Sequence, residues 1–153
     1  MNELKDTVVI YHGACRDGFG AAYAAWKKYG DTASYIPWRD HEKIPEGLDN
    51  KEIFVVDFSF PKNLQEEMRA KNHSLVIIDH HKTAEEDIKM FPENVFDLEH
   101  SGAVLAWKYF HPATEIPVLL KYIEDGDLWK CELPHYREFA AALGEYKMDF
   151  ETW

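Results

Sequence analysis

The chain has 153 residues, of which 46% are hydrophobic and 29% charged, a composition typical of one ordinary globular domain. Lys and Arg number 17 and Asp and Glu number 28, so the formal net charge is −11, which excludes a general basic groove for long duplex nucleic acid. Phosphate chemistry is still open to the protein if metal cations supply the positive charge.

Cys15 and Cys131 are the two cysteines, and they form neither a disulfide framework nor a Cys-x-x-Cys zinc pattern. The chain begins without a signal-like segment, and none of its apolar runs approaches the ~18 residues that a transmembrane helix requires. We therefore expect a cytoplasmic protein with no membrane partner.

Short β-branched and aromatic runs alternate with helical segments along the chain. After their first residue, the runs at 7–11, 52–56 and 74–78 are continuously β-branched, aliphatic or aromatic, as strands covered on both faces are, and weaker strands are expected at 33–38 and 94–98. Helices are expected at 21–29, 61–70 and 83–90, and helices dominate from about 101, at 101–110, 116–124 and 136–143. This alternation predicts an α/β fold with a mostly parallel β-sheet and helices on both faces.

Potential metal ligands stand at the carboxyl ends of the three strong strands. In chain order they are His12 with nearby Asp17, then Asp57, and then Asp79, His80 and His81. Because ligands of parallel sheets bind at that edge, we expect these side chains to meet. Clustered carboxylates repel one another unless cations lie among them. Carboxylate and imidazole together suit Mn²⁺, with Mg²⁺, Co²⁺, Zn²⁺ and Fe²⁺ as alternatives.

Two such ions bridged by a shared carboxylate would hold a hydroxide and clamp a phosphoryl group for in-line displacement. Asp57 is the natural bridging ligand, because the middle motif should lie between the other two. Residues 13–20 add three glycines next to a helix start, where a phosphate could approach closely and meet free backbone N–H groups.

These motifs resemble those of the DHH phosphoesterase family. His12-Gly-Ala-Cys15-Arg-Asp17-Gly, Val56-Asp57-Phe-Ser59 and Asp79-His80-His81 match its first three motifs in order and spacing. Residues 99–107 resemble the Ser-Gly-Ala helix start of the family and residues 123–129 its fourth motif, so the resemblance covers residues 8 to about 130. It implies a Rossmann-like DHH domain, here a single domain over 1–153, with metal-dependent phosphoesterase activity.

The resemblance also implies roles for individual residues. One Mn²⁺ would be held by His12 and Asp57, and the other by Asp17, Asp57, His80 and Asp125, with Asp127 as the alternative to Asp125. The substrate phosphate would meet His81, Ser101, Gly102 and Lys82. The catalytic residues would be His81, Asp57, Asp79 and Arg16, with Asp79 orienting its neighbours and Arg16 and Lys82 steadying developing charge.

The chain departs from the family pattern in two places. Cys15 stands where the family usually has an additional Asp. It is either a thiolate ligand that favours Zn²⁺ or Fe²⁺, or a small buried thiol. Nothing after Leu143 resembles the Gly-Gly-Gly-His motif of the DHH-associated second domain. Three interpretations follow from this. The chain is a catalytic-domain fragment, a partner or another subunit of an oligomer supplies the other wall of the substrate cleft, or the cleft is open.

The enzymes to which the resemblance points are RecJ-type exonucleases, oligoribonucleases, cyclic-dinucleotide phosphodiesterases, and pyrophosphate or polyphosphate hydrolases. An acidic chain favours a short oligonucleotide or small nucleotide as substrate. One rival hypothesis is a metal-binding or nucleotide-binding module without catalysis. Another is a metal-free nucleotide-binding protein, which is disfavoured because Gly-x-Gly-x-x-Gly is missing from the first loop.

Overall fold

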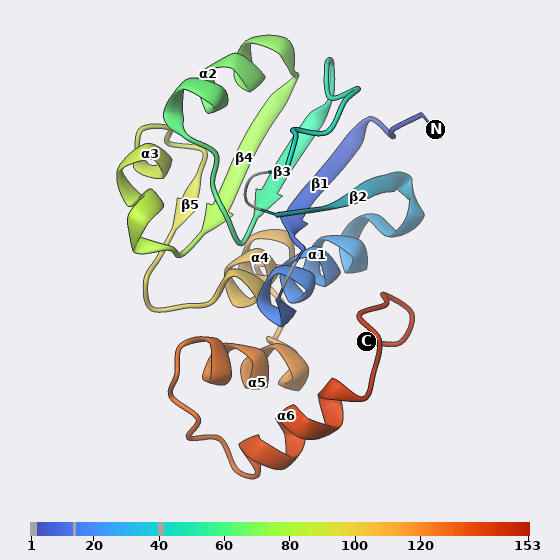
Figure 1. The fold of residues 1–153 in the computed structure, drawn as a ribbon, viewed down its shortest axis with the longest axis vertical. Coiled ribbons are helices and arrows are strands. Elements are labelled where there is room, and N and C mark those ends of the chain that lie inside the picture. The colour runs from blue at the N-terminus through green and yellow to red at the C-terminus, as the bar shows by residue number, and fades with distance from the viewer. Residues whose placement is uncertain (1–2, 14, 40–41) are drawn as a thin grey trace.

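The computed structural model describes residues 3–13, 15–39 and 42–153, and its centre is a five-stranded sheet (Figure 1). The strands are β1 (Thr7–His12), β2 (Ala33–Trp38), β3 (Glu52–Val56), β4 (Ser74–Asp79) and β5 (Val95–Phe96). Their order is β2-β1-β3-β4-β5, and each neighbouring pair is parallel. The predicted α/β class with a parallel sheet is confirmed.

The strand order reverses beside β1. From β1 the chain moves outward to β2, and then crosses to β3 on the other side of β1. Such a reversal leaves a crevice beyond the carboxyl ends of the two central strands, and this is where open α/β sheets bind their ligands. The side chains that follow β1 and β3 therefore stand at the place where chemistry is expected.

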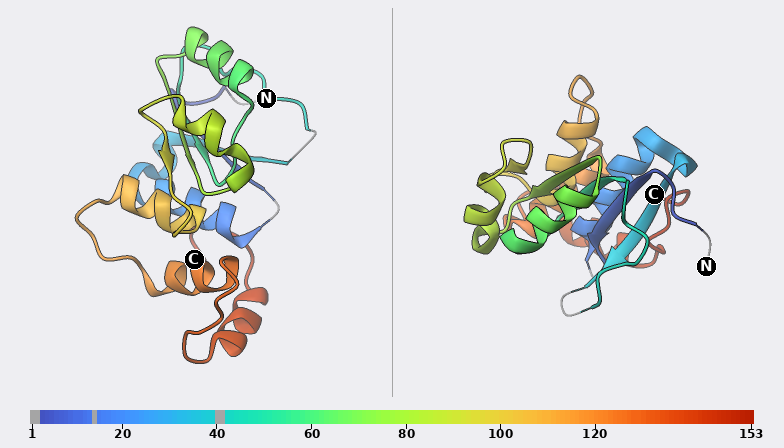
Figure 2. Two further views of the ribbon diagram at one scale, coloured as in Figure 1. Left: turned by 90° about the vertical axis from the view of Figure 1, so that its left-hand side faces the viewer. Right: turned by 90° about the horizontal axis from the view of Figure 1, so that it is seen from above.

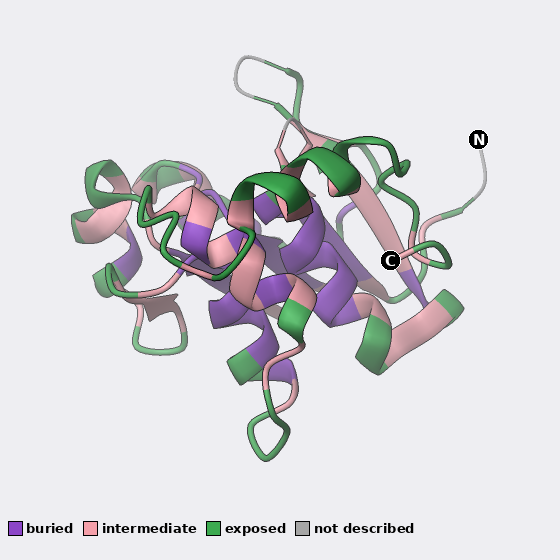
Figure 3. Ribbon diagram, turned by 90° about the horizontal axis from the view of Figure 1, so that it is seen from below, coloured by how far each residue is buried: buried purple, intermediate pink, exposed green. Residues whose placement is uncertain are grey.

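Helices cover both faces of the sheet (Figures 1 and 2). On one face α1 (Arg16–Tyr29), α4 (Gly102–Phe110) and α5 (Val118–Asp127) share a core with Val9 and Phe54. On the other face α2 (Lys62–Lys71) and α3 (Glu85–Lys89) share a core with Val8 and Val55. Successive side chains of one strand thus pack into the cores on opposite faces of the sheet, as the pleat requires. In Figure 3 the buried residues gather at the centre of the molecule.

Helix α1 begins at Arg16, five residues before the expected start at residue 21. The glycines that we interpreted as a loop explain the difference, because Gly18 and Gly20 lie inside the helix. A Cβ on Gly18 would stand 2.1 Å from the carbonyl oxygen of His12, and one on Gly20 would stand 2.9 Å from the Cβ of Ala103. Gly18 and Gly20 thus let α1 pass close to β1 and α4, and they lie inside the helix and not in the loop before it.

The other elements follow the predicted pattern closely. Two 3₁₀ turns, η1 (Gly30–Thr32) and η2 (Lys82–Ala84), precede β2 and α3, and α6 (Tyr136–Gly144) is the last helix. After α6 the chain turns back, and the ring of Phe150 stacks on that of Phe19 of α1 with centroids 4.9 Å apart. In the part of the chain that the structure describes, none of the helices combines the length and apolar character that a membrane crossing needs.

Candidate metal centre

The carboxyl ends of β1, β3 and β4 lie side by side and bring the predicted ligands together. Strand β1 ends at His12, β3 ends one residue before Asp57, and β4 ends at Asp79, directly before His80. Because β3 pairs with β1 on one side and with β4 on the other, Asp57 occupies the central place predicted for it.

Asp57 contacts a different set of side chains with each of its oxygens. The residue is 1% exposed and takes a left-handed φ of 62°, which Asp adopts more readily than bulky residues. Its Oδ2 lies 3.5 Å from Nδ1 of His12 and accepts a hydrogen bond from Sγ of Cys15 at 3.3 Å. Its Oδ1 lies 3.3 Å from Nε2 of His80. Each oxygen of Asp57 therefore faces a different group of potential ligands.

Asp17 is held by the start of α4. Its Oδ2 accepts the backbone N–H of Gly102 at 2.7 Å and its Oδ1 accepts that of Ala103 at 3.0 Å, while Oδ2 also lies 3.6 Å from Nε2 of His80. The positive end of the α4 dipole therefore stabilises the charge of Asp17. In the cation-free site, burial and the neighbouring Asp57 raise the pKa of Asp17.

This geometry corrects the expectation that Ser101 and Gly102 bind substrate phosphate. Ser101 is fully buried, and its Oγ accepts the backbone N–H of Val104 at 3.5 Å, which caps its own helix. The backbone N–H of Gly102 already donates a hydrogen bond to Asp17. The anion at this helix end is a side chain of the protein, and for that reason the N-terminus of α4 is not available to a ligand.

Gly102 is required by its close approach to Asp57, and we expect Gly102→Ala to disrupt the centre. A Cβ at this position would stand 2.5 Å from Oδ1 of Asp57. The overpacking should cost about 1–3 kcal/mol of stability and displace the carboxylate of Asp57. Thermal unfolding together with Mn²⁺ binding by titration calorimetry measures both effects.

The matched control is Ser101→Ala at the same helix end. This variant should lose about 0.5–2 kcal/mol through the missing cap and lose less Mn²⁺ affinity than Gly102→Ala, because it adds no atom near Asp57 and removes only the hydrogen bond between the Ser101 side chain and Asp17. Equal losses of Mn²⁺ affinity in the two variants would argue against a specific role for the close approach at Gly102.

The structure also corrects the choice between the two acidic residues at the end of α5. Asp127 Oδ2 lies 3.5 Å from Nε2 of His80. The carboxylate of Asp125 instead accepts the backbone N–H groups of Glu132 and Leu133, both at 3.1 Å. Residues two apart in a helix point about 200° away from each other, so only one of the pair can face the centre. Asp127 is that residue, and Asp125 organises the loop after α5.

Asp79 orients the two histidines that follow it, as expected. Its Oδ1 accepts the backbone N–H of His80 at 2.8 Å and that of His81 at 3.3 Å, and it lies 2.7 Å from Nδ1 of His81. The hydrogen bond with Asp79 raises the pKa of His81 to about 9, against the opposing effect of burial. The half-exposed imidazole is therefore fixed at Nδ1, and its Nε2 is the nitrogen that can reach a ligand.

Three buried atoms at this edge of the described structure have no hydrogen-bond partner: Asp57 Oδ1, Asp79 Oδ2 and His80 Nε2. Around them, three groups of residues each offer donor atoms within 4.8 Å of one another. They are His12, Cys15 and Asp57; Asp17, His80 and Asp127; and Asp57, Asp79, His80 and His81. Buried polar atoms are normally paired, and carboxylate, imidazole and thiol donors suit transition-metal ions. The residues present fit divalent cations.

The side chains of the centre shift one another's pKa values in opposite directions. Burial alone would raise the pKa of Asp57, but the imidazoles of His12 and His80 outweigh burial and lower it. Burial, followed by the charge of Asp57, raises the pKa of Cys15, so that Cys15 stays a thiol and donates to Asp57. Opposite shifts among groups in contact are typical of functional sites.

The two cationic residues expected beside the phosphate are engaged elsewhere. Arg16 donates from Nη1 to the carbonyl oxygen of Ala140 on α6 at 3.0 Å. The exposed ammonium of Lys82 pairs with Glu85 on the surface. Arg16 thus flanks the candidate ligands Cys15 and Asp17 in the same pocket, with its guanidinium held by α6, whereas Lys82 is engaged on the surface.

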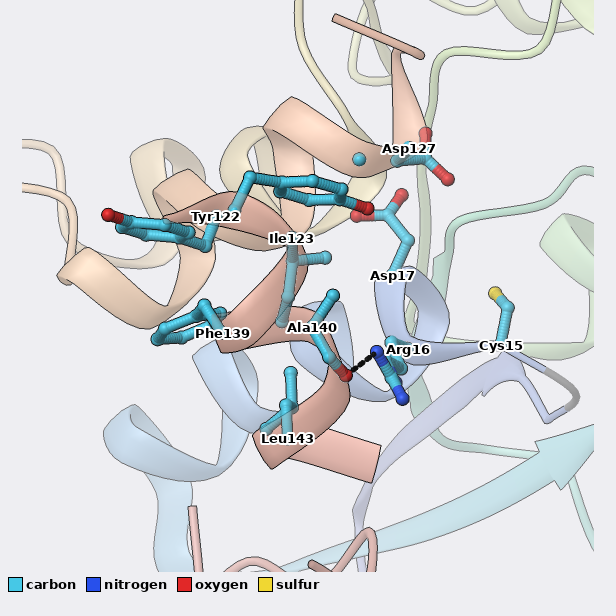
Figure 4. Close-up of a pocket in the computed structure, with 11 residues that line it drawn as sticks. Cys15, Arg16, Asp17, Tyr122, Ile123, Asp127, Phe139, Ala140 and Leu143 are labelled. Carbon is cyan, nitrogen blue, oxygen red and sulfur yellow. Dashed lines mark hydrogen bonds between the residues drawn. The ribbon is translucent and has the colours of Figure 1, made fainter. Parts of the chain in front are cut away.

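Two pockets flank the centre. One, of about 180 Å³, is lined by His12, Asp57, Asp79 and His81. The other, of about 210 Å³, runs from Cys15, Asp17 and Asp127 to a wall of apolar and aromatic side chains. Figure 4 shows that the carboxylates of Asp17 and Asp127 face each other at one end of this second pocket, with Tyr122, Phe139 and Leu143 farther along it.

This aromatic wall could not be predicted from the sequence. The pattern of residues 136–143 predicts a helix, but a helical pattern does not tell which neighbour its apolar face meets. One signal was available in Gly126, between the two acidic residues. A Cβ there would stand 2.2 Å from the hydroxyl oxygen of Tyr136, so a glycine at this point permits the close contact of α5 and α6.

Fold and site together define an α/β protein with a candidate metal centre at the carboxyl edge of a parallel sheet. No family model matches the chain. The chain is 36% identical over 170 residues to the uncharacterized protein R106 of Acanthamoeba polyphaga mimivirus, and the match covers 100% of this chain and 40% of that protein. The chain thus spans well under half the length of this curated relative.

The fold is also similar to the crystal structure of an uncharacterized protein from Helicobacter pylori G27. The TM-score is 0.69 at 14% sequence identity, over 84% of this chain and 44% of that chain. At this identity the similarity concerns the fold alone.

Proposed function

We propose that this chain is a DHH-type metal-dependent phosphoesterase that hydrolyses phosphodiester bonds of short oligonucleotides or small nucleotides. One observation carries the proposal: Asp57 Oδ1 and His80 Nε2 are buried at the ends of adjacent strands, 3.3 Å apart, and neither atom makes a hydrogen bond within the described residues. Burying such groups is costly unless something compensates them. A divalent cation compensates a carboxylate and an imidazole together.

In the proposed reaction, different side chains bind the cations and donate the proton. Asp57 would hold two cations with its two oxygens, with His12 on one side and with Asp17, His80 and Asp127 on the other. Divalent cations bound there, Mn²⁺ first and Mg²⁺, Co²⁺, Zn²⁺ or Fe²⁺ as alternatives, would activate water and neutralise phosphoryl charge. His81, anchored by Asp79, would donate a proton from Nε2 to the substrate phosphate or the leaving oxygen.

The pocket beside Asp127 favours an organic phosphate over an inorganic one. Its far wall is made of Tyr122, Tyr136, Phe139 and Leu143, which offer apolar surface and aromatic faces. A pyrophosphate or polyphosphate would leave this wall unused, whereas the sugar or base of a nucleotide would contact it. The net charge of −11 also favours a small substrate over a long polyanion.

A second candidate function is a metal- and nucleotide-binding module without turnover. The observation that favours it is the length comparison: the chain matches only 40% of its viral relative, so the remainder of such a protein could complete the cleft or supply the partner domain.

Both cysteines of the chain are free. We assign either form of the protein to a reducing compartment such as the cytoplasm, where a thiol next to the centre stays reduced.

The test is hydrolysis by protein that has been stripped with a chelator and reloaded with Mn²⁺. Three substrates are compared: bis(p-nitrophenyl) phosphate, a short oligoribonucleotide and pyrophosphate. We expect Mn²⁺-dependent cleavage of the two diesters, reduced at least ~100-fold in His80→Ala and unchanged in His73→Ala, because His73 is exposed just before β4 at the opposite edge of the sheet.

Each other outcome contradicts the proposal in a different way. Bound Mn²⁺ without cleavage identifies the module. Cleavage of pyrophosphate alone identifies a phosphoanhydride hydrolase. Protein that binds no divalent cation removes the basis of the proposal.

A further inference from the structure

We infer that Cys15 is a metal ligand and that the centre is asymmetric, with one subsite for a thiophilic cation such as Zn²⁺, Fe²⁺ or Co²⁺ and one for a harder cation such as Mn²⁺ or Mg²⁺. The inference rests on the proposed metal centre and specifies which cation each half takes. Its basis is the geometry of His12, Cys15 and Asp57.

These three residues present their donor atoms at the corners of a small triangle. Sγ of Cys15 lies 3.1 Å from Nδ1 of His12 and 3.3 Å from Oδ2 of Asp57, and the latter two atoms are 3.5 Å apart. Ligands on one tetrahedral zinc ion, with Zn–S near 2.3 Å and Zn–N near 2.0–2.1 Å, are about 3.3–3.6 Å apart. The three atoms therefore need to move by only a few tenths of an ångström to share one ion.

The backbone fixes the position of the sulfur. Cys15 is the N-cap of α1, and its Sγ accepts the backbone N–H of Gly18 at 3.2 Å. Only glycine fits at position 18, since a Cβ there would overlap the carbonyl oxygen of His12. The N-terminus of a helix favours negative charge on a cysteine sulfur. The sulfur is thus held in position by the backbone, and burial together with Asp57 keeps it a thiol until a cation displaces the proton.

Binding exchanges a proton for a metal. The Cys15 thiol keeps its proton and donates a hydrogen bond to Oδ2 of Asp57. When the cation enters, the S–H bond breaks, the sulfur keeps the electron pair and donates it to the cation, and the proton leaves to solvent.

The other subsite contains no sulfur. Its donors are carboxylate oxygens of Asp17 and Asp127, Nε2 of His80 and Oδ1 of Asp57. Three oxygens and one nitrogen suit Mn²⁺ or Mg²⁺, whereas sulfur selects softer ions. Asp57 separates the two environments, because Oδ2 faces Cys15 and Oδ1 faces His80.

Co²⁺ is the probe, because a thiolate ligand gives it an intense near-ultraviolet charge-transfer band that oxygen and nitrogen ligands do not give. Chelator-stripped protein is titrated with Co²⁺ under reducing conditions. We expect the band to grow with the first equivalent in the wild type and in Cys131→Ser, whose side chain is exposed. Cys15→Ser should lose the band and bind Zn²⁺ at least ~10-fold more weakly, while remaining folded because serine is a good N-cap.

A third variant, Cys15→Asp, restores an anionic ligand of the harder kind. It should shift the preference of the first subsite from Zn²⁺ toward Mn²⁺ in competition experiments. Visible Co²⁺ bands without the charge-transfer band in the wild type would overturn the inference and leave the metal centre intact. Absence of Co²⁺, Zn²⁺ and Mn²⁺ binding altogether would instead refute the proposed function on which the inference rests.

Discussion

Replacing Asp57 by asparagine is expected to abolish the stabilisation of this protein by divalent cations. In the wild type, free Mn²⁺ at 100 times its dissociation constant should stabilise the fold by about 2.7 kcal/mol. For a chain of this size this energy raises Tm by about 5–11 °C. Asparagine keeps the shape of the side chain but replaces one of the two oxygens by an amide nitrogen that cannot bind a cation, and it removes the charge that both subsites share.

The measurement is thermal unfolding of each protein with chelator and with Mn²⁺. Asp31→Asn is the control, since Asp31 is an exposed acidic residue in η1, before β2. It should keep the full cation-dependent rise in Tm. A rise of wild-type size in Asp57→Asn would show that the stabilising cation binds elsewhere, and Asp57 would then have a purely structural role at the end of β3.

The strand ends could be predicted because their pattern is local. The continuous apolar runs at 7–11, 52–56 and 74–78 match β1, β3 and β4 to within one residue. Once the sheet is parallel, the residues after these strands must share one edge. Thus His12, Asp57 and His80 could be brought together from sequence alone, and Asp57 could be placed between the other two.

Contacts between distant segments could not be predicted in this way. The glycines of residues 13–20 indicated a loop because glycine weakens helices, yet Gly18 and Gly20 are helical and are needed where α1 passes β1 and α4. Likewise, nothing near Ser101 in the sequence shows that Asp17, more than 80 residues earlier, fills the end of α4. Such assignments depend on packing between elements, which local patterns do not contain.

Asp127→Asn should weaken Mn²⁺ binding and Asp125→Asn should lower stability, although the two residues are separated only by Gly126. Asp127 faces His80, so its loss removes a charged ligand, and Mn²⁺ affinity and Mn²⁺-dependent hydrolysis should fall at least ~100-fold. The free energy of unfolding of the cation-free protein should change little, because Asp127 is partly exposed and the charge it loses lies close to the buried Asp17.

Asp125→Asn should destabilise the protein by about 1–3 kcal/mol and leave Mn²⁺ affinity within a few-fold of the wild type. The carboxylate of Asp125 accepts two backbone N–H groups, and its carbonyl oxygen accepts those of Lys130 and Cys131, both at 3.0 Å. An asparagine can accept only one of the two side-chain bonds, so the loop that follows α5 loses part of its anchor. Denaturant unfolding and calorimetry on both variants separate the two effects. If Asp125→Asn lost the metal and Asp127→Asn lost stability, the helix would present its other side to the centre, and the fourth motif would act as the sequence resemblance first implied.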